Sequence, residues 1–213
     1  MDGLEPTMKK LTTYSRDDLQ IVSRKLQWQG YFRMIKYTFS HKLFKGGVSK
    51  PIERELFERG HAVVVIPYDP ITDQVVLIEQ IRVGAFDHQI NPWMIELVAG
   101  IIDEGEDSQS VAIRETFEET GLECQQCKKI MSYLSSPGGM SERIDMYIAR
   151  VDVTKISQYA GLEAEGEDIR VFVMNRTDAL KALESGEIKN GASIIGLQWL
   201  ALNVDKLNQQ WLS

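Results

Sequence analysis

Carboxylates crowd the stretch "GIIDEGEDSQSVAIRETFEETGL", residues 100–122, where Glu115, Glu118 and Glu119 lie within five residues of one another. Carboxylates four residues apart on a helix repel each other, at a cost of about 0.2–0.5 kcal/mol per pair. Hard divalent cations such as Mg²⁺ prefer oxygen ligands, usually one or two carboxylates together with the phosphates of a substrate. The segment is therefore a candidate metal site for chemistry on a phosphorylated compound.

A helix is predicted over residues 108–120, with Asp107 or Ser108 as its N-cap and Gly121 at its end. At 100° per residue this helix has two faces. One carries Ala112, Ile113, Thr116, Phe117 and Thr120, and the other carries Arg114, Glu115, Glu118 and Glu119. Taken alone, the acidic face would be interpreted as the solvated side of an amphipathic helix, and a docking surface for a partner protein is a further alternative.

The spacing of these residues resembles the Nudix box, G-x5-E-x7-R-E-U-x-E-E-x-G-U. Its fixed positions are all occupied, by Gly100, Glu106, Arg114, Glu115, Glu118, Glu119 and Gly121. Thr116 departs from the pattern, which has a bulky aliphatic residue there, and this affects packing rather than the carboxylates. The resemblance implies a hydrolase acting on a nucleoside diphosphate linked to another group.

A narrower resemblance rests on "SSPGGMSER", where Pro137 follows the box by fifteen residues. This placement, together with "ELFERGHAVVVIPYDP", "VVLIEQIR", "PWMIELVAGIIDEGE" and "GLEAEGEDIRV", is similar to the ADP-ribose pyrophosphatases of the superfamily. It implies metal-dependent hydrolysis of ADP-ribose to AMP and ribose 5-phosphate. The alternatives are a related enzyme for another nucleoside diphosphate sugar or a dinucleotide, and a non-catalytic ADP-ribose sensor, which the intact box glutamates disfavour.

Residue by residue, the resemblance implies a metal site made of the Ala99 carbonyl, Glu115, Glu119 and Glu167, with Glu118 close by. The expected cation is Mg²⁺, with Mn²⁺ or another divalent ion as the alternative. Glu165, in "LEAEGED", matches the general base of the family, and Glu167 or a box glutamate is the alternative base. Without the resemblance, this loop would be interpreted as a solvated acidic linker.

The resemblance also implies residues that bind the substrate: Tyr31, Arg54, Arg82, Ser136 and Glu142. Guanidinium groups suit phosphate oxygens, although Arg54 and Arg82 could instead form surface ion pairs with Glu53 and Glu79. Tyr31 falls where the family stacks an aromatic ring on adenine, but Tyr31 or Phe32 could equally belong to a hydrophobic core.

The elements that must position these residues are strands and three helices, which predicts an α+β protein. Alternating segments within residues 19–60 predict a small antiparallel sheet, residues 61–83 a hairpin, and residues 93–100, 128–136, 143–153 and 169–175 further strands. Helices are predicted at 176–188, capped by Thr177, and at 192–212. Residues 157–168 are predicted to be a polar loop.

The resemblance implies a Nudix fold, an αβα sandwich with a mixed sheet, over residues 57–213. Residues 1–56 would form the preceding small β-domain, exchanged across a homodimer so that it contributes to the partner's substrate site. A small sheet is marginally stable alone, which agrees with that expectation.

Composition excludes several classes of protein. A net charge of −7 argues against a nucleic-acid-binding face, which would be basic. No stretch approaches the roughly 18 apolar residues of a membrane span, and the first residues do not resemble a secretory signal, so a cytoplasmic location is expected. Cys124 and Cys127 form a C-x-x-C pair that could be redox-active or half of a zinc site, but two reduced thiols are favoured.

Overall fold

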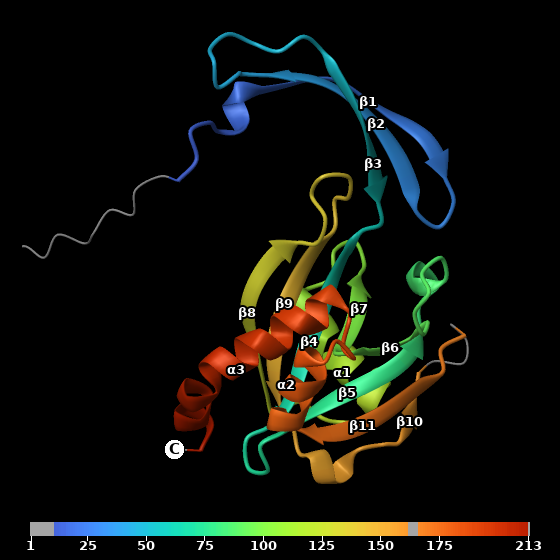
Figure 1. Ribbon diagram of the computed structural model, residues 1–213, viewed down its shortest axis with the longest axis vertical. Coiled ribbons are helices and arrows are strands. Elements are labelled where there is room, and N and C mark those ends of the chain that lie inside the picture. The colour runs from blue at the N-terminus through green and yellow to red at the C-terminus, as the bar shows by residue number, and fades with distance from the viewer. Residues whose placement is uncertain (1–10, 162–165, 213) are drawn as a thin grey trace, which may run out of the picture. The chain divides into compact units, whose positions relative to one another are not determined.

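The structure, a computed structural model, describes residues 11–161 and 166–212 (Figure 1). The chain divides into two compact units. The residues up to Arg59 form one unit together with Ser136–Ser141, and Gly60–Ser135 with Glu142–Ser213 form the other.

The first unit is built on a three-stranded antiparallel sheet of β1 (Leu19–Gln29), β2 (Arg33–His41) and β3 (Ile52–Glu58), preceded by the single 3-10 turn η1 (Arg16–Asp18). This confirms the small antiparallel sheet predicted from the alternating sequence. Ile35 is buried in it, and the rings of Phe32 and Phe57 meet edge to face at 5.1 Å. The loop of residues 136–141 joins the sheet through β3, because the N–H of Phe57 donates to the carbonyl of Gly139 at 2.8 Å.

The second unit is built on a mixed eight-stranded sheet with the order β10-β11-β5-β4-β9-β8, in which β6 pairs with β5 and β7 pairs with β4. Strands β4 and β9 run parallel, and the other pairs are antiparallel. The strands are β4 (His61–Asp69), β5 (Gln74–Ile81), β6 (Trp93–Glu96), β7 (Val98–Ile102), β8 (Gln126–Leu134), β9 (Arg143–Arg150), β10 (Tyr159–Ala160) and β11 (Ile169–Asn175). Short 3-10 turns lie at η2 (Val83–Ala85) and η3 (Val153–Lys155).

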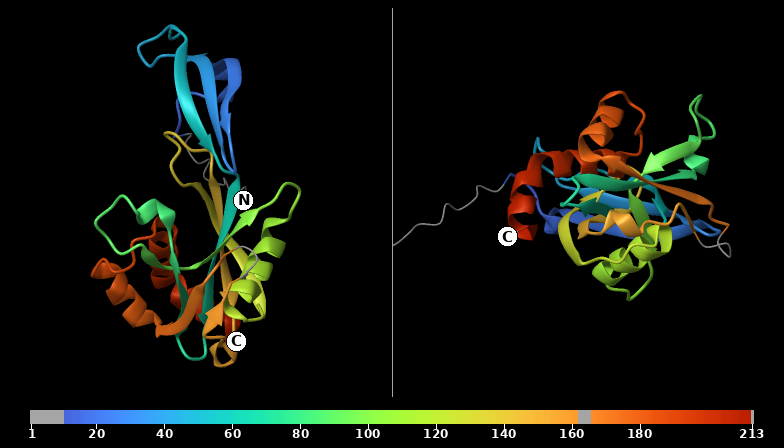
Figure 2. Two further views of the ribbon diagram at one scale, coloured as in Figure 1. Left: turned by 90° about the vertical axis from the view of Figure 1, so that its right-hand side faces the viewer. Right: turned by 90° about the horizontal axis from the view of Figure 1, so that it is seen from below.

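Helices cover both faces of this sheet, α1 (Ser108–Thr120) on one face and α2 (Arg176–Glu184) with α3 (Gly191–Trp211) on the other (Figure 2). Strand β4 shows why. Its side chains alternate, so that Val63 and Val65 pack with Val111 of α1. Val64 and Ile66 belong to the core under α3 instead. The period of two that makes a strand face two ways therefore produces the predicted αβα sandwich.

Three local predictions are wrong. Residues 93–100 are not one strand but two. Before Leu97 the strand β6 pairs with β5, and after Leu97 the strand β7 pairs with β4. The N-cap of α2 is Asn175 rather than Thr177, which lies inside the helix. The predicted loop at 157–168 contains the two-residue strand β10, because Tyr159 and Ala160 pair with the start of β11.

Candidate active site

The edge of the site is the strand β7, which the chain reaches by crossing from β5 to β4. Glu96 pairs with Ile78 of β5, whereas Val98 pairs with Val65 of β4. Leu97 stands at the crossing, and its N–H donates to the hydroxyl of Ser193 in α3 at 2.9 Å. This hydrogen bond satisfies a buried N–H between the two strand pairings, as buried backbone groups require.

The acidic face of α1 lies against β7 rather than in solvent. The N–H of Ala99 donates to Glu119 Oε2 at 3.0 Å, and Glu119 is only 3% exposed. In an antiparallel strand the N–H and C=O of one residue point the same way, so the carbonyl of Ala99 also faces the side from which Glu119 approaches.

The solvated-face interpretation of the helix is therefore wrong, and the face that carries Ile113 and Phe117 is only partly buried. Ile113 and Phe117 are 43% and 56% exposed, while Val111, Thr116 and Glu119 are buried. The helix is turned so that the carboxylates of one face, and not its two large apolar side chains, approach the sheet.

Gly100 makes room for Glu115. A Cβ built on Gly100 would lie 2.1 Å from the carboxyl carbon and Oε1 of Glu115. A side chain at position 100 would thus occupy the place of this carboxylate, which explains the requirement for the first glycine of the box.

Arg114 gathers the remaining box carboxylates. Its guanidinium contacts Glu115 Oε1 at 2.9 Å and Glu118 Oε2 at 2.8 Å, and lies 3.9 Å from Glu106 Oε2. Glu106 in turn accepts from the N–H of Asp103 at 3.0 Å, which fixes the loop before the helix. Arg114 therefore restrains three carboxylates of the box.

Negative charge accumulates around Glu119. Burial raises the pKa of Glu119 well above its usual range; the Ala99 hydrogen bond opposes this, while the charges of Glu115 and Glu167 add to it. The positive charge of Arg82 lowers the pKa in turn. These interactions show that Glu115, Glu119, Glu167 and Arg82 share one electrostatic environment.

This environment fits a hard divalent cation by its donor chemistry. In the described part of the chain no group of three or more His, Cys, Asp or Glu side chains is gathered tightly enough to hold a metal ion without rearrangement. Glu115 and Glu118 instead bind the guanidinium of Arg114. However, the groups at the site are carboxylate and carbonyl oxygens with an excess of negative charge, which suits Mg²⁺ or Mn²⁺ rather than a soft metal.

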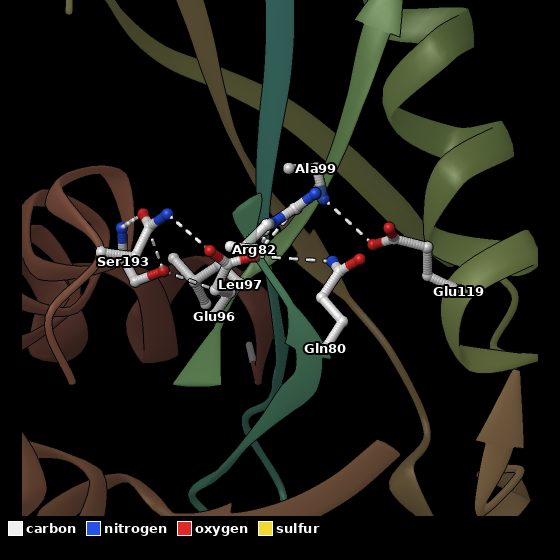
Figure 3. A network of polar contacts seen from close by, with 8 residues as sticks. Gln80, Arg82, Glu96, Leu97, Ala99, Glu119 and Ser193 are labelled. Atoms are coloured by element: carbon white, nitrogen blue, oxygen red, sulfur yellow. Dashed lines mark hydrogen bonds and ion pairs between the residues drawn. The ribbon is translucent and has the colours of Figure 1, made fainter. Parts of the chain in front are cut away.

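Arg82 is held by a carboxylate that sequence reasoning did not single out. Its Nε and Nη2 donate to Glu96 Oε2 at 2.9 and 2.8 Å, and Asn190 donates to the other oxygen of Glu96 at 2.8 Å. Figure 3 shows this network and the Ala99–Glu119 contact together. The signal in the sequence was a single Glu in the apolar segment "WMIELVAG".

The other predicted residues fall in different parts of the molecule. Glu142 is buried in the second unit. Tyr31, Arg54 and Ser136 belong to the first unit, where Tyr31 is exposed and not part of a core. Glu165 lies outside the described residues.

The alternative ion pairs for the two arginines are not formed. Glu53 pairs with Lys36 at 2.7 Å and Glu79 with Arg170 at 2.6 Å. Arg54 donates to the backbone carbonyl of Glu53 at 2.7 Å.

Cys124 and Cys127 are half-buried free thiols beside α1. A hydrogen bond from the Cys127 thiol lowers the pKa of Cys124 to about 7, against the effect of burial. Separately, no helix in residues 11–161 and 166–212 is long and apolar enough to cross a membrane.

Comparison with known proteins agrees with this geometry. Residues 58–195 match the NUDIX domain. The chain belongs to the Nudix family. An ADP-ribose pyrophosphatase of Escherichia coli strain K12 is 47% identical to this Nudix protein over 199 residues, covering 93% of this chain and 95% of the relative.

More distant relatives include a second kind of pyrophosphatase and a solved structure. A GDP-mannose pyrophosphatase of Pectobacterium atrosepticum is 30% identical over 181 residues, covering 84% of this chain and 92% of the relative. A solved structure described as an ADP compounds hydrolase superposes with a TM-score of 0.66 at 18% identity, covering 90% of this chain and 98% of that one, which supports the Nudix fold.

Proposed function

We propose that this Nudix protein hydrolyses the diphosphate bond of ADP-ribose, giving AMP and ribose 5-phosphate. The observation that carries the proposal is the 47% identity, over nearly the whole length of both chains, to a relative named for that activity. The hydrogen bond between Glu119 and the N–H of Ala99 supports the proposal. It places a box carboxylate next to the backbone of β7, where the family resemblance expects the metal ligands.

We propose that Mg²⁺, or Mn²⁺ in its place, is held by Glu115, Glu119 and Glu167 with the carbonyl of Ala99, and that Glu118 lies next to them. A divalent cation there would offset the charge of the diphosphate and make a water more acidic. The chain's own residues orient the site. The N–H of Ala99 fixes the direction of Glu119, and Arg114 restrains Glu115 and Glu118.

The general base in this proposal is Glu165, which takes a proton from the water that attacks phosphorus. Glu167 is the alternative base. Arg82 would bind the diphosphate, since a guanidinium matches phosphate oxygens with paired N–H donors. Glu142 is proposed to contribute a further substrate contact.

A homodimer with exchanged N-terminal domains completes the proposal, with Tyr31, Arg54 and Ser136 serving the partner's site. Exposed apolar side chains on β1, among them Val22 and Trp28, support an interface, since such surface on a small sheet is usually covered.

Mixing inactive Arg54→Ala and Glu119→Gln proteins tests the exchange. Random reassortment of twofold dimers restores about a quarter of the wild-type sites, whereas no recovery after subunit exchange would contradict it.

The decisive experiment for function is a panel of nucleoside diphosphate conjugates with Mg²⁺, with products identified by mass. We expect the highest kcat/KM for ADP-ribose. A higher value for GDP-mannose would favour the second candidate, which the 30% identical relative supports. Tight binding of ADP-ribose without turnover would indicate a sensor. An Mg²⁺ affinity unchanged by Glu119→Gln would favour a protein that uses the acidic face of α1 as a docking surface.

A further inference from the structure

Glu96 is a charged side chain in an apolar segment. It is 2% exposed, and the next residue, Leu97, is fully buried in the core. Burial of a carboxylate is costly unless it is paired and hydrogen-bonded, and a buried ion pair is often no more stabilising than apolar residues of similar size. Stability alone therefore does not account for a glutamate at this position.

Each oxygen of Glu96 has its own donor. Oε2 accepts from Nε and Nη2 of Arg82 at 2.9 and 2.8 Å, and Oε1 accepts from Nδ2 of Asn190 at 2.8 Å. The amide of Gln80 lies at a longer 3.5 Å from Oε2. Gln80 belongs to β5, Arg82 follows it, and Asn190 stands at the start of α3. Figure 3 shows Gln80 and Arg82 directed at Glu96.

The contact with Glu96 uses only one edge of the Arg82 guanidinium. A guanidinium carries five N–H donors in a planar fork, and Nε and Nη2 form one edge of it. Within the described part of the chain the guanidinium of Arg82 donates to Glu96 alone. The side chain is 43% exposed, and Figure 3 shows it beside Ala99, whose N–H donates to Glu119, so the opposite edge is available to an anion at the box glutamates.

Asn190 has two separable roles. As the N-cap of α3, its Oδ1 accepts from the N–H of Ser193 at 3.1 Å. Its Nδ2 is then directed at Glu96. Ser193, one turn later, accepts from the N–H of Leu97. The beginning of α3 is thus fastened to two successive residues of the crossing between β6 and β7.

We propose that Glu96 and Asn190 form a positioning clamp that holds Arg82 in the orientation that binds the diphosphate of the substrate. This rests on the proposed function, because it assigns a partner to the substrate arginine of that site. A long, partly exposed arginine has many rotamers, and fixing one before binding saves the entropy of ordering it later. Glu96 and Asn190 do not touch the substrate themselves.

The first test is Glu96→Gln, which keeps the size and removes the charge. We expect KM to rise about tenfold, the loss typical of a hydrogen bond to a charged group, with kcat and Tm close to wild type. In an Arg82→Ala background the same substitution should leave KM unchanged, because the group it positions is absent. The matched control is Glu79→Gln, which breaks the exposed Glu79–Arg170 pair on the same sheet and should leave KM at the wild-type value.

The second test separates the two roles of Asn190. Serine is as good an N-cap as asparagine, but it is too short to reach Glu96. Asn190→Ser should therefore keep the Tm while raising KM in the same direction as Glu96→Gln. This variant decides the matter if Glu96→Gln fails to fold.

Every variant is measured with whichever conjugate the wild-type protein hydrolyses best, so the outcome for the clamp does not depend on ADP-ribose being that conjugate. Wild-type KM in both Glu96→Gln and Asn190→Ser would overturn the clamp while leaving the proposed function intact. An equal rise in KM with and without Arg82 would also overturn it, since Glu96 would then act by another route. Absence of both binding and turnover in the wild-type panel would overturn the proposed function and the clamp together.

Discussion

Gly100→Ala is a sharp test of the site, because it adds one methyl group at a defined place. The φ angle of Gly100 is not in the left-handed region, so the backbone accepts alanine. The added Cβ would lie 2.1 Å from the carboxyl carbon of Glu115, and ordinary contact begins at 3.4 Å. The carboxylate must therefore retreat by 3.4 − 2.1 = 1.3 Å.

A displacement of this size predicts a large kinetic effect with little effect on folding. Misplacing a catalytic group by about 1 Å costs roughly 10²-fold in rate, or about 2.7 kcal/mol of barrier at about 1.36 kcal/mol per tenfold. Replacing glycine by alanine in an allowed conformation stabilises by about 0.4–1 kcal/mol through the unfolded chain. We therefore expect kcat/KM to fall about 10²-fold while the Tm is maintained.

The assay is kcat/KM for ADP-ribose with saturating Mg²⁺, together with thermal unfolding in EDTA. The control is Gly84→Ala, whose added Cβ meets no atom within 4 Å and should change neither quantity. In a Glu115→Gln background, Gly100→Ala should cause no further loss, since both changes disable the same carboxylate. Wild-type kcat/KM in Gly100→Ala, or additive losses in the double variant, would refute this account of Glu115.

Three further outcomes are expected. Burial and the charge of Glu115 raise the pKa of Glu119 above its unfolded value of 4.5, so the contribution of Glu119 to the stability of metal-free protein is fully present below pH 4.5 and is lost as the pH rises through the folded pKa. Glu119→Gln should flatten that pH dependence and abolish turnover. It should also raise the metal-free Tm at pH 8 by roughly 2–4 °C per kcal/mol recovered. An unchanged dependence of the Tm on pH in EDTA would count against a buried charge at Glu119. Glu165→Gln should reduce kcat far more than Mg²⁺ affinity by calorimetry, and a full rate would transfer the base role to another residue. Because the Cys127 thiol lowers the pKa of Cys124, Cys127→Ala should move the half-point of Cys124 alkylation above about pH 7, and an unmoved half-point would show that the two thiols do not interact.

Local features of the site could be predicted because they depend on neighbours in the chain. The helix over 108–120, its cap at Asp107 or Ser108 and its end at Gly121 follow from side chains within one turn of each other, and the structure has the cap at Asp107. The pairing of Arg114 with Glu118 follows from the same spacing.

The direction in which α1 faces did not follow from its apolar residues. Periodicity placed Ile113 and Phe117 on the more apolar face of the helix, yet both are exposed, and Glu119 of the acidic face is buried. The orientation of a helix depends on all of its contacts with the neighbouring elements. Here the N–H of Ala99 on β7 donates to the carboxylate of Glu119.

The sequence by itself determined the three helices and most of the strands to within a few residues, and it determined the spacing that identifies the Nudix box. Only the tertiary structure decided that β6 and β7 separate at Leu97, and that Glu96 meets Asn190, 94 residues later in the chain. The physical reason is the range of the interactions. Periodicity and capping act over a few residues, whereas the contact of α3 with the crossing strand depends on how a whole helix packs on a folded sheet.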